Sequence, residues 1–319
     1  MTSDTKHRTF RDDITLVTMY LNLGCFQKGK EKGKYVPKLS KKLYDSWMPV
    51  FGKIANPTVM YCETDELEHE FKDYRKSMLS TATKVIQSDR SKLWSFTKQP
   101  AVEKIYGNPD YPHFHPNTIA EYTCCMHAKY DVLEDAIENN FFNTKYYAWL
   151  DVGYFRDLAT NPEKLAKRKN FKLMVPADFD PTKVAYCVVW PEEAKSPFIT
   201  TEKVFKENRT WIGGGYFLAT GPVMLEWIKE YRRYVQKFLE MGLSNSDQQI
   251  LFAMLHTEDE KPKVPVQLYT LENPGKETDK GGTTRGRSNP WFYLGYLCKA
   301  TWEKKMGIET PKEEACNVM

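Results

Sequence analysis

A single carboxylate follows one of the most apolar short segments of the chain. Residues 146–150 are Tyr-Tyr-Ala-Trp-Leu, Asp151 follows directly, and Gly153 comes two residues later. A run of this kind predicts a strand buried on both faces, and the ligands of open α/β sheets bind beyond the carboxyl ends of such strands. We therefore expect Asp151 to hold a metal ion or a sugar hydroxyl. The simpler alternative is that Asp151 caps the next turn.

A metal ion at Asp151 would need a second ligand. A carboxylate-bound Mn²⁺ or Mg²⁺ neutralises a leaving diphosphate as a Lewis acid, and the usual arrangement is Asp-x-Asp at a strand end. Gly153 stands in place of the second acid. Asp151 would then depend on another carboxylate or on His256 to complete the metal site. Alternatively, it binds a ribose or sugar hydroxyl without a metal.

Asp247, Gln248 and Gln249 are expected in the first turn of a helix with Ser246 as its cap. The helix dipole favours an acid in this position by about 0.3–1 kcal/mol, which could explain Asp247 alone. Consecutive amides can also make bidentate contacts to sugar hydroxyls or to a developing oxyanion. Asp247, Gln248 and Asp151 are therefore the candidate catalytic residues.

The glycine run Gly213-Gly214-Gly215 precedes a short apolar strand. Its spacing matches no phosphate-binding loop. Either at least one glycine provides a tight turn with a positive φ, or the run forms an open floor on which an acceptor sugar approaches the backbone.

Two further segments carry polar side chains of possible function. Arg285 and Arg287 lie among glycines shortly before Trp291. They belong either to a solvated loop or to a lid whose guanidinium groups close over a diphosphate. His113 and His115 form a His-x-His pair in a proline-rich segment, which we expect at the surface.

The composition is that of a soluble globular protein: 319 residues, 41% hydrophobic and 28% charged. The net charge of +4, with acids and bases interspersed, argues against nucleic acid as the main partner. No secretory signal or membrane span is visible, and scattered cysteines fit reduced thiols in the cytoplasm. The last four residues, from Cys316, match a farnesylation pattern without a polybasic second signal. Membrane association, on the cytoplasmic face, is expected only if Cys316 is prenylated.

The elements that must position these residues follow an α/β pattern. Residues 14–21 are predicted as the first, central strand, and helices alternate with buried strands, which implies a parallel sheet. Thr118 is expected to open the clearest helix with a capping box, and His127 and Lys129 are expected off its apolar face. Further strands are expected at 57–63, 85–86, 184–190 and, as an edge, 264–271, whereas 92–115 is expected to be irregular. The predicted organisation is a flexible tail over residues 1–12, one domain over 13–303 and a tail over 304–319.

Several of these segments resemble the HtrL/YibB family, a poorly characterised, glycosyltransferase-like group. The resemblance spans about residues 14–300 and is most specific at Trp149-Leu-Asp-Val-Gly153. The other matching segments are residues 14–18, 59–63, 213–219 and 247–249. The order of elements is also similar to that of nucleotide-sugar transferases of the GT-A type.

The resemblance implies a GT-A-like, Rossmann-like fold: a mixed, mostly parallel sheet flanked by helices. It implies a metal ion or donor sugar at Asp151 and a reacting centre near Asp247 and Gln248. The residues expected to bind the donor are Thr15, Val17, Thr18, Glu63, Arg285, Arg287 and Trp291. Those expected to bind the acceptor or sugar are Gly213, Gly214, Gly215, Tyr154 and Arg156.

The implied activity is transfer of a sugar from a nucleotide-sugar donor to a glycan or other hydroxyl acceptor. The alternative is a non-catalytic carbohydrate-binding protein on the same fold, which the missing second acid favours. A nucleotidyl transferase is a weaker alternative, because it would require a phosphate-binding loop after the first strand, and residues 23–29 supply only a poor version.

Overall fold

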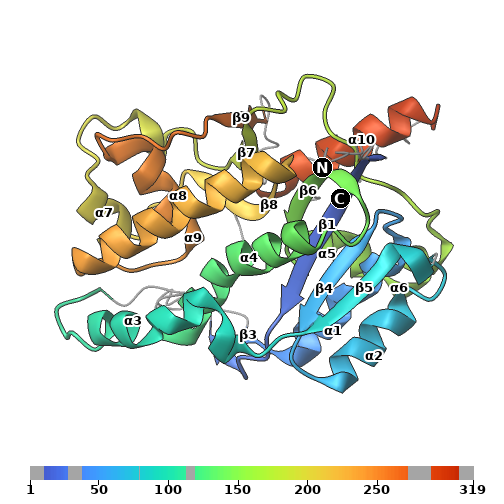
Figure 1. Cartoon of the computed structure of the whole chain (residues 1–319), viewed down its shortest axis with the longest axis horizontal. Coiled ribbons are helices and arrows are strands. Elements are labelled where there is room, and N and C mark those ends of the chain that lie inside the picture. Colours follow the sequence, from blue (N-terminus) through green and yellow to red (C-terminus); the bar gives the residue numbers. More distant parts are fainter. Residues whose placement is uncertain (1–10, 28–37, 79, 113–118, 272–288, 309–319) are drawn as a thin grey trace, which may run out of the picture.

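A seven-stranded sheet forms the centre of the molecule, in the order β5-β4-β1-β6-β8-β7-β9 (Figure 1). The computed structural model describes residues 11–27, 38–78, 80–112, 119–271 and 289–308. The strands are β1 (Arg11–Tyr20), β4 (Thr58–Cys62), β5 (Thr83–Gln87), β6 (Thr144–Leu150), β7 (Val184–Val188), β8 (Ile212–Thr220) and β9 (Val266–Thr270). Strand β8 is antiparallel to both of its neighbours, and the other pairs are parallel. The predicted α/β fold with a mixed, mostly parallel sheet is confirmed.

The central strands are buried on both faces, as their apolar runs predict. In β1, Val17 and Met19 belong to the core on one side of the sheet, whereas Leu16 and Tyr20 belong to the core on the other. Side chains alternate in this way because successive residues of a strand point to opposite faces.

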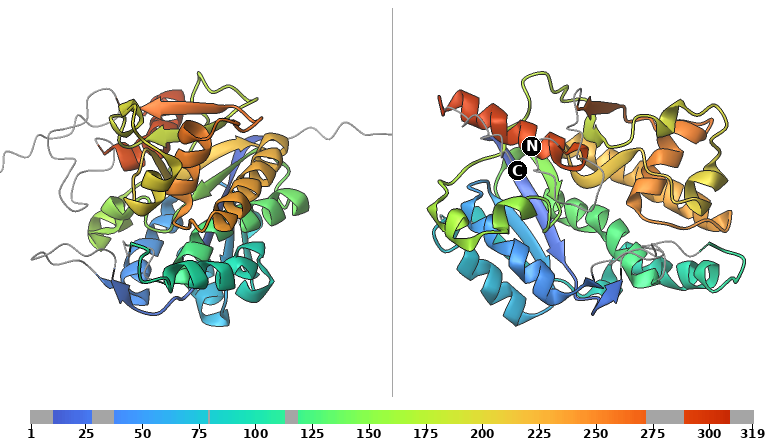
Figure 2. Two further views of the ribbon diagram at one scale, coloured as in Figure 1. Left: turned by 90° about the vertical axis from the view of Figure 1, so that its left-hand side faces the viewer. Right: turned by 180° about the vertical axis from the view of Figure 1, so that it is seen from behind.

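Helices cover both faces of the sheet (Figures 1 and 2). One core includes residues of α3 (Gln99–Tyr106), α4 (Ala120–Asn139), α7 (Thr201–Lys206), α8 (Gly221–Glu240) and α9 (Asp247–Phe252). The other includes residues of α2 (Asp65–Tyr74), α6 (Pro162–Lys167) and α10 (Tyr293–Lys305), and partly buried residues of α1 (Lys41–Trp47) and α5 (Arg156–Ala159) pack against it. A two-residue pair, β2 (Phe26–Gln27) and β3 (Lys38–Leu39), completes the strands of the described ranges. None of the helices within those ranges has the length and apolarity of a membrane span.

The strand order reverses beside β1. The chain passes from β1 outward to β4 and β5, and it returns through α4 to β6 on the other side of β1. Ligands of open α/β sheets bind beyond the carboxyl ends of the strands at such a switch point. A site is therefore expected beyond the ends of β1 and β6.

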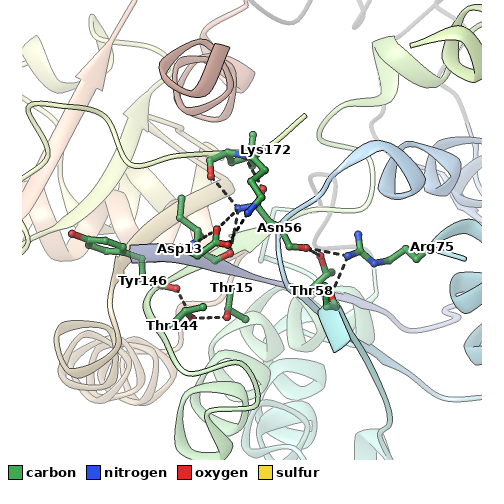
Figure 3. Close-up of polar contacts among 11 residues, drawn as sticks. Asp13, Thr15, Asn56, Thr58, Arg75, Thr144, Tyr146 and Lys172 are labelled. Carbon is green, nitrogen blue, oxygen red and sulfur yellow. Dashed lines mark hydrogen bonds and ion pairs between the residues drawn. The ribbon is translucent and has the colours of Figure 1, made fainter. Parts of the chain in front are cut away.

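At the opposite end of the strands, where β1, β4 and β6 begin, buried hydrogen bonds close the sheet (Figure 3). The hydroxyls of Thr15 and Thr144 lie 2.6 Å apart, and Asn56 donates to the backbone carbonyl of Ile14 at 3.3 Å. The guanidinium of Arg75 donates to four backbone carbonyls around the starts of β4 and β5. These polar groups have their hydrogen-bond partners within the protein, so this end of the sheet has a structural role.

The segment 92–115 and the start of α4 differ from what the sequence predicts. The segment 92–115 was expected to be irregular, but it contains α3 and the 3₁₀ turn Trp94–Lys98, so that prediction is wrong. Short helices joined by prolines carry little periodic signal. The capping box predicted at Thr118 lies partly outside the described residues, and α4 begins at Ala120 with Ile119 in the N-cap position.

Helix α4 is buried around most of its circumference, and the prediction that Lys129 lies off the apolar face is wrong. His127 and Lys129 are only 2% and 1% exposed. Lys129 lies seven residues after Tyr122 and four before Leu133, so the 3.6-residue repeat places it on the apolar face itself. His127 lies off that face but is covered by α8, where the Tyr231 hydroxyl is 2.7 Å from its Nδ1.

Candidate functional site

A cavity of about 500 Å³ opens beyond the carboxyl ends of β1 and β6. Tyr20 at the end of β1, Asp151 directly after β6, and Gly215 on β8 all line it. Its volume lies within the range of about 300–1,000 Å³ that is typical of small-molecule sites. The cavity is therefore at the switch point of the sheet.

Much of the cavity wall is aromatic. The apolar face of an aromatic ring packs well against a flat base or the C–H face of a sugar. The aromatic residues that line the cavity are Tyr20, Tyr44, Trp47, Tyr122, Trp149, Tyr154, Trp190, Trp291 and Phe292. The predicted binding residues Tyr154, Arg156 and Trp291 thus all lie at one cavity.

Strand pairing positions Asp151. Its backbone N–H donates to the carbonyl of Gly215 at 2.9 Å, which continues the pairing of β6 with β8. The Trp149 indole donates to Oδ1 at 2.6 Å, and the side chain remains 40% exposed. Enclosure by the surrounding protein raises the pKa of Asp151; the Lys129 ammonium opposes this effect, and the charge of Asp247 adds to it.

Lys129 lies between Asp151 and Asp247. Its Nζ is 3.3 Å from Asp151 Oδ1 and 3.0 Å from Asp247 Oδ2, and it also donates to the carbonyl of Gly214 at 3.0 Å. Three contacts match the three N–H donors of an ammonium group. Burial disfavours the charge of Lys129, but the two carboxylates outweigh burial and raise its pKa to about 12. Lys129 is therefore a cation at neutral pH that ties the two acids together.

Sequence reasoning missed Lys129, although a signal was present. A lysine on the apolar face of a helix is almost never fully buried unless it has an acidic partner. Correct placement of Lys129 on that face would have prompted a search for buried carboxylates. Asp151 and Asp247 were already candidates.

Asp247 is the first residue of α9 and is only 1% exposed, yet it lines the cavity. Its Oδ2 accepts from Lys129. Its Oδ1 has no hydrogen-bond partner among the described residues. A buried acceptor without a donor is costly, so this oxygen is available to a ligand or to water.

The glycine run makes room for the two acids. A Cβ at Gly214 would overlap Asp247 Oδ2, and one at Gly215 would lie 3.2 Å from Asp151 Oδ2. The three glycines lie inside β8, and none of them has a positive φ. The tight-turn interpretation is therefore wrong. Of the three, Gly215 lines the cavity and Gly213 and Gly214 do not.

The two amides after Asp247 have different surroundings. Gln248 lines the cavity. Gln249 is buried, where its amide donates to the carbonyl of Arg209 at 3.0 Å and to the hydroxyl of Thr210 at 3.1 Å. Ser246 occupies the N-cap position but donates to the Gln249 side chain instead of capping the helix. Gln249 therefore holds the neighbouring segment in place, and Gln248 is the amide that a ligand can reach.

Arg156 brings a cation to the cavity from the start of α5. Its guanidinium lies 4.6 Å from the centre of the Phe292 ring and 5.7 Å from that of Trp47. One N–H donates to the carbonyl of Gly153 at 3.2 Å, and no carboxylate of the described residues forms an ion pair with it. Burial lowers the pKa of Arg156, and Asp151 opposes this effect. The remaining donors suit an anionic ligand such as a phosphate.

Gly153 has a packing reason to lack a side chain. A Cβ there would lie 2.6 Å from Cε3 of Trp47. A second acid therefore does not fit at this position. The nearest equivalent is Asp247, which reaches Lys129 from a different part of the chain.

Four predicted donor-binding residues do not line the cavity. Thr15, Val17 and Thr18 are buried inside the sheet along β1, and Met19 and Tyr20 further along the strand reach the cavity instead. Glu63 forms an ion pair with Arg90 at the same end of the strands as the cavity, but it does not line the cavity.

The structure also does not bring His256 to Asp151. His256 lies in a π-helical turn, Ala253–Thr257, where its Nε2 is 2.7 Å from the carbonyl of Ala194. It does not line the cavity. Across the described ranges, no group of three or more His, Cys, Asp and Glu residues could hold a metal ion. Arg285, Arg287, His113, His115 and Cys316 lie outside those ranges.

The family model described as "Bacterial protein of unknown function (HtrL_YibB)" matches residues 12–261. The chain belongs to the HtrL/YibB family. The expected family is thus confirmed, and the matched span of this HtrL/YibB protein contains Lys129, Asp151, Arg156 and Asp247. A search of the curated proteins found no match.

Two glycosyltransferases are among the solved structures that resemble this HtrL/YibB protein. The galactosyltransferase LgtC in complex with donor and acceptor sugar analogs aligns with a TM-score of 0.38 and 9% identity, over 80% of this chain and 72% of that one. Mouse xyloside xylosyltransferase 1 in its apo form aligns with a TM-score of 0.37 and 12% identity, over 81% and 85%. Likenesses of this size carry no functional argument.

Proposed function

We propose that this HtrL/YibB protein transfers a sugar from a nucleotide-sugar donor to a glycan or another hydroxyl acceptor. The observation that carries the proposal is a pair of unused carboxylate oxygens at one cavity. Asp247 Oδ1 is buried with no hydrogen-bond partner among the described residues, and its Oδ2 is held by Lys129. The contacts of Asp151 with Trp149 and Lys129 are both made by Oδ1, which leaves Oδ2 on the partly exposed side chain. Each acid is thus fixed in place and keeps one acceptor free.

Paired acceptors inside aromatic walls suit a polyhydroxylated ligand. A carboxylate oxygen accepts a hydrogen bond from a sugar hydroxyl, and the neighbouring rings cover the apolar face of a sugar or a base. Gln248 adds an amide that can both donate and accept. These groups support recognition of a sugar more strongly than recognition of an apolar molecule.

Arg156 is the group we assign to the diphosphate of the donor. Among the described residues that line the cavity, no other Arg or Lys is present. The guanidinium of Arg156 is held between aromatic rings and has unused N–H donors, so it can stabilise the negative charge that develops on a leaving diphosphate. Arg285 and Arg287 remain proposed as a lid over the same group.

Asp151 is the group we assign to the acceptor hydroxyl. Its pKa is raised, and a base accepts a proton most effectively when its pKa approaches the working pH. Asp247 and Gln248 would orient the donor sugar. The residues present do not fit a Mn²⁺ or Mg²⁺ ion between the two acids, because the Lys129 ammonium lies there. No step is therefore assigned to a metal.

The test combines binding and transfer. Isothermal titration against a set of uridine and guanosine diphosphate sugars should identify a donor. Asp151→Asn should then lower the transfer rate by about 10²–10⁴-fold, the usual contribution of a positioned base, while the circular dichroism spectrum stays unchanged. Asp180→Asn is the matched control, because Asp180 pairs with Lys183 at the surface.

A non-catalytic carbohydrate-binding protein is the second candidate, and the absence of space for a second acid at Gly153 favours it. Glycan-array binding without any donor hydrolysis would support this candidate. No binding of any nucleotide sugar, together with normal glycan binding by Asp151→Asn, would exclude the transferase.

The six cysteines within the described ranges are all free, which agrees with the proposed cytoplasmic location.

A further inference from the structure

The two acids at the cavity are bridged by a cation that belongs to the chain itself. The ammonium of Lys129 contacts Asp151 Oδ1 and Asp247 Oδ2 at 3.3 and 3.0 Å. Two carboxylates at the end of a sheet are the groups that would share a divalent ion in a metal-dependent transferase. The lysine therefore occupies the place of that ion.

Lys129 is built into this position. It is 1% exposed on α4, its third contact is the carbonyl of Gly214, and its Nζ lies 5.6 Å from the centre of the Trp149 ring. Gly214 has no Cβ, which lets Asp247 approach the backbone of β8 closely enough to meet the ammonium. An ammonium with all its donors used has no reason to leave for solvent.

A divalent ion on the same acids would face this fixed charge. It would have to bind through the two free oxygens, within a few ångströms of the ammonium, in a setting where charges are poorly screened. Among the described residues a third protein ligand is also missing, because His256 lies away from the cavity and Gly153 stands where a second acid would be needed. Both conditions lower the affinity of the site for a cation.

We propose that Lys129 is a built-in replacement for the divalent ion. It acts as a positioning residue that fixes Asp151 and Asp247, neutralises part of their charge, and lets the cavity bind a nucleotide sugar without Mn²⁺ or Mg²⁺. The statement about the donor rests on the proposed function. The statement about the cation does not, so the two are tested separately.

The cation is tested first, without nucleotide. Mn²⁺ is titrated into the full chain and followed by electron paramagnetic resonance for three proteins: the wild type, Lys129→Ala and Lys206→Ala. Lys206 pairs with Glu202 at the surface and serves as the matched control. We expect Lys129→Ala to gain one Mn²⁺ site at least about 10-fold tighter than any site in the other two proteins, because the repulsion has been removed.

The identity of the gained site is checked in two ways. Adding Asp151→Asn to Lys129→Ala should abolish it. Mn²⁺ should also raise the melting temperature of Lys129→Ala and leave that of the wild type unchanged, since a ligand stabilises only the folded state that binds it.

Either of two results would overturn the proposal: one stoichiometric Mn²⁺ site in the wild type that Asp151→Asn removes, or a folded Lys129→Ala protein that gains no site. If Lys129→Ala does not fold, the wild-type titration decides alone. Calorimetry with uridine or guanosine diphosphate then tests the donor: equal affinity in EDTA and in Mn²⁺ supports the proposal, and at least about 10-fold tightening by Mn²⁺ contradicts it. If neither nucleotide binds in either buffer, the proposed function fails while the Mn²⁺ titration still decides the role of Lys129.

Discussion

Two buried cations lie at opposite ends of the strands of the same sheet, and their hydrogen-bond partners differ. Arg75, 2% exposed, donates to four backbone carbonyls and to the hydroxyl of Thr83, and none of the described carboxylates pairs with it. Lys129, 1% exposed, contacts two carboxylates and one carbonyl. Burial lowers the pKa of Arg75 to about 10, whereas the two acids raise that of Lys129 to about 12.

The difference separates a structural cation from one at a site. Four of the five hydrogen bonds of Arg75 go to backbone carbonyls and the fifth goes to the Thr83 hydroxyl, so no donor is left for a ligand; Figure 3 shows Arg75 beside Asn56. Each acid that contacts Lys129 keeps one oxygen free beside a cavity. A buried charge does not by itself mark a functional site. Partners that keep an unused hydrogen-bond acceptor beside a cavity do mark one.

The largest expected effect follows from removing the structural cation. Arg75→Met should lower the free energy of unfolding by about 3–5 kcal/mol, because several buried carbonyls lose their donor at about 1–3 kcal/mol each and such losses do not add fully. Urea denaturation measures this change, with the half-exposed Arg233→Met as the control. The nucleotide-sugar affinity of the folded protein should not change. A folded Arg75→Met protein with weakened nucleotide-sugar binding would contradict the purely structural role assigned to Arg75.

A smaller effect is expected from crowding Asp247. Gly214→Ala places a methyl group where Asp247 Oδ2 lies, so it should cost about 1–3 kcal/mol of stability and also weaken ligand binding by about 10-fold. Gly215→Ala should do less, because its Cβ would lie 3.2 Å from Asp151 Oδ2. Denaturation and titration calorimetry on both variants give the order. The reverse order would show that the ammonium does not fix Asp247 as tightly as the contacts indicate.

The effect that is smallest near neutral pH concerns a buried base with no acid partner. Burial lowers the pKa of His127 from 6.5 to about 3, and Lys129 adds to the effect. The unfolded chain therefore binds a proton between these values and the folded chain does not, so the stability is complete above pH 6.5 and is lost as the pH falls toward 3. Relative to His127→Gln, the wild type should lose up to about 1.4 kcal/mol per pH unit below this point. Parallel slopes for the two proteins in urea titrations would contradict a neutral, buried His127.

The sequence alone determined the framework and half of the site. Apolar runs predict buried strands wherever both faces are covered, so β1, β4 and β6 were correctly expected, and Asp151 follows from the end of β6. Arg156 and Trp291 were also expected at the site, and both line the cavity. The inferences about the strands and Asp151 succeed because strand burial and the location of strand ends are local properties.

Only the tertiary structure decided which groups meet. Asp247 reaches Asp151 because β8 inserts antiparallel beside β6 and its glycines admit the carboxylate. Lys129 joins them from a helix on one face of the sheet, and β1 contributes Met19 and Tyr20 in place of Thr15, Val17 and Thr18 because the cavity lies beyond the strand end. Such contacts depend on strand order and on how far each strand extends. These properties arise from packing between distant segments, which no local pattern of residues encodes.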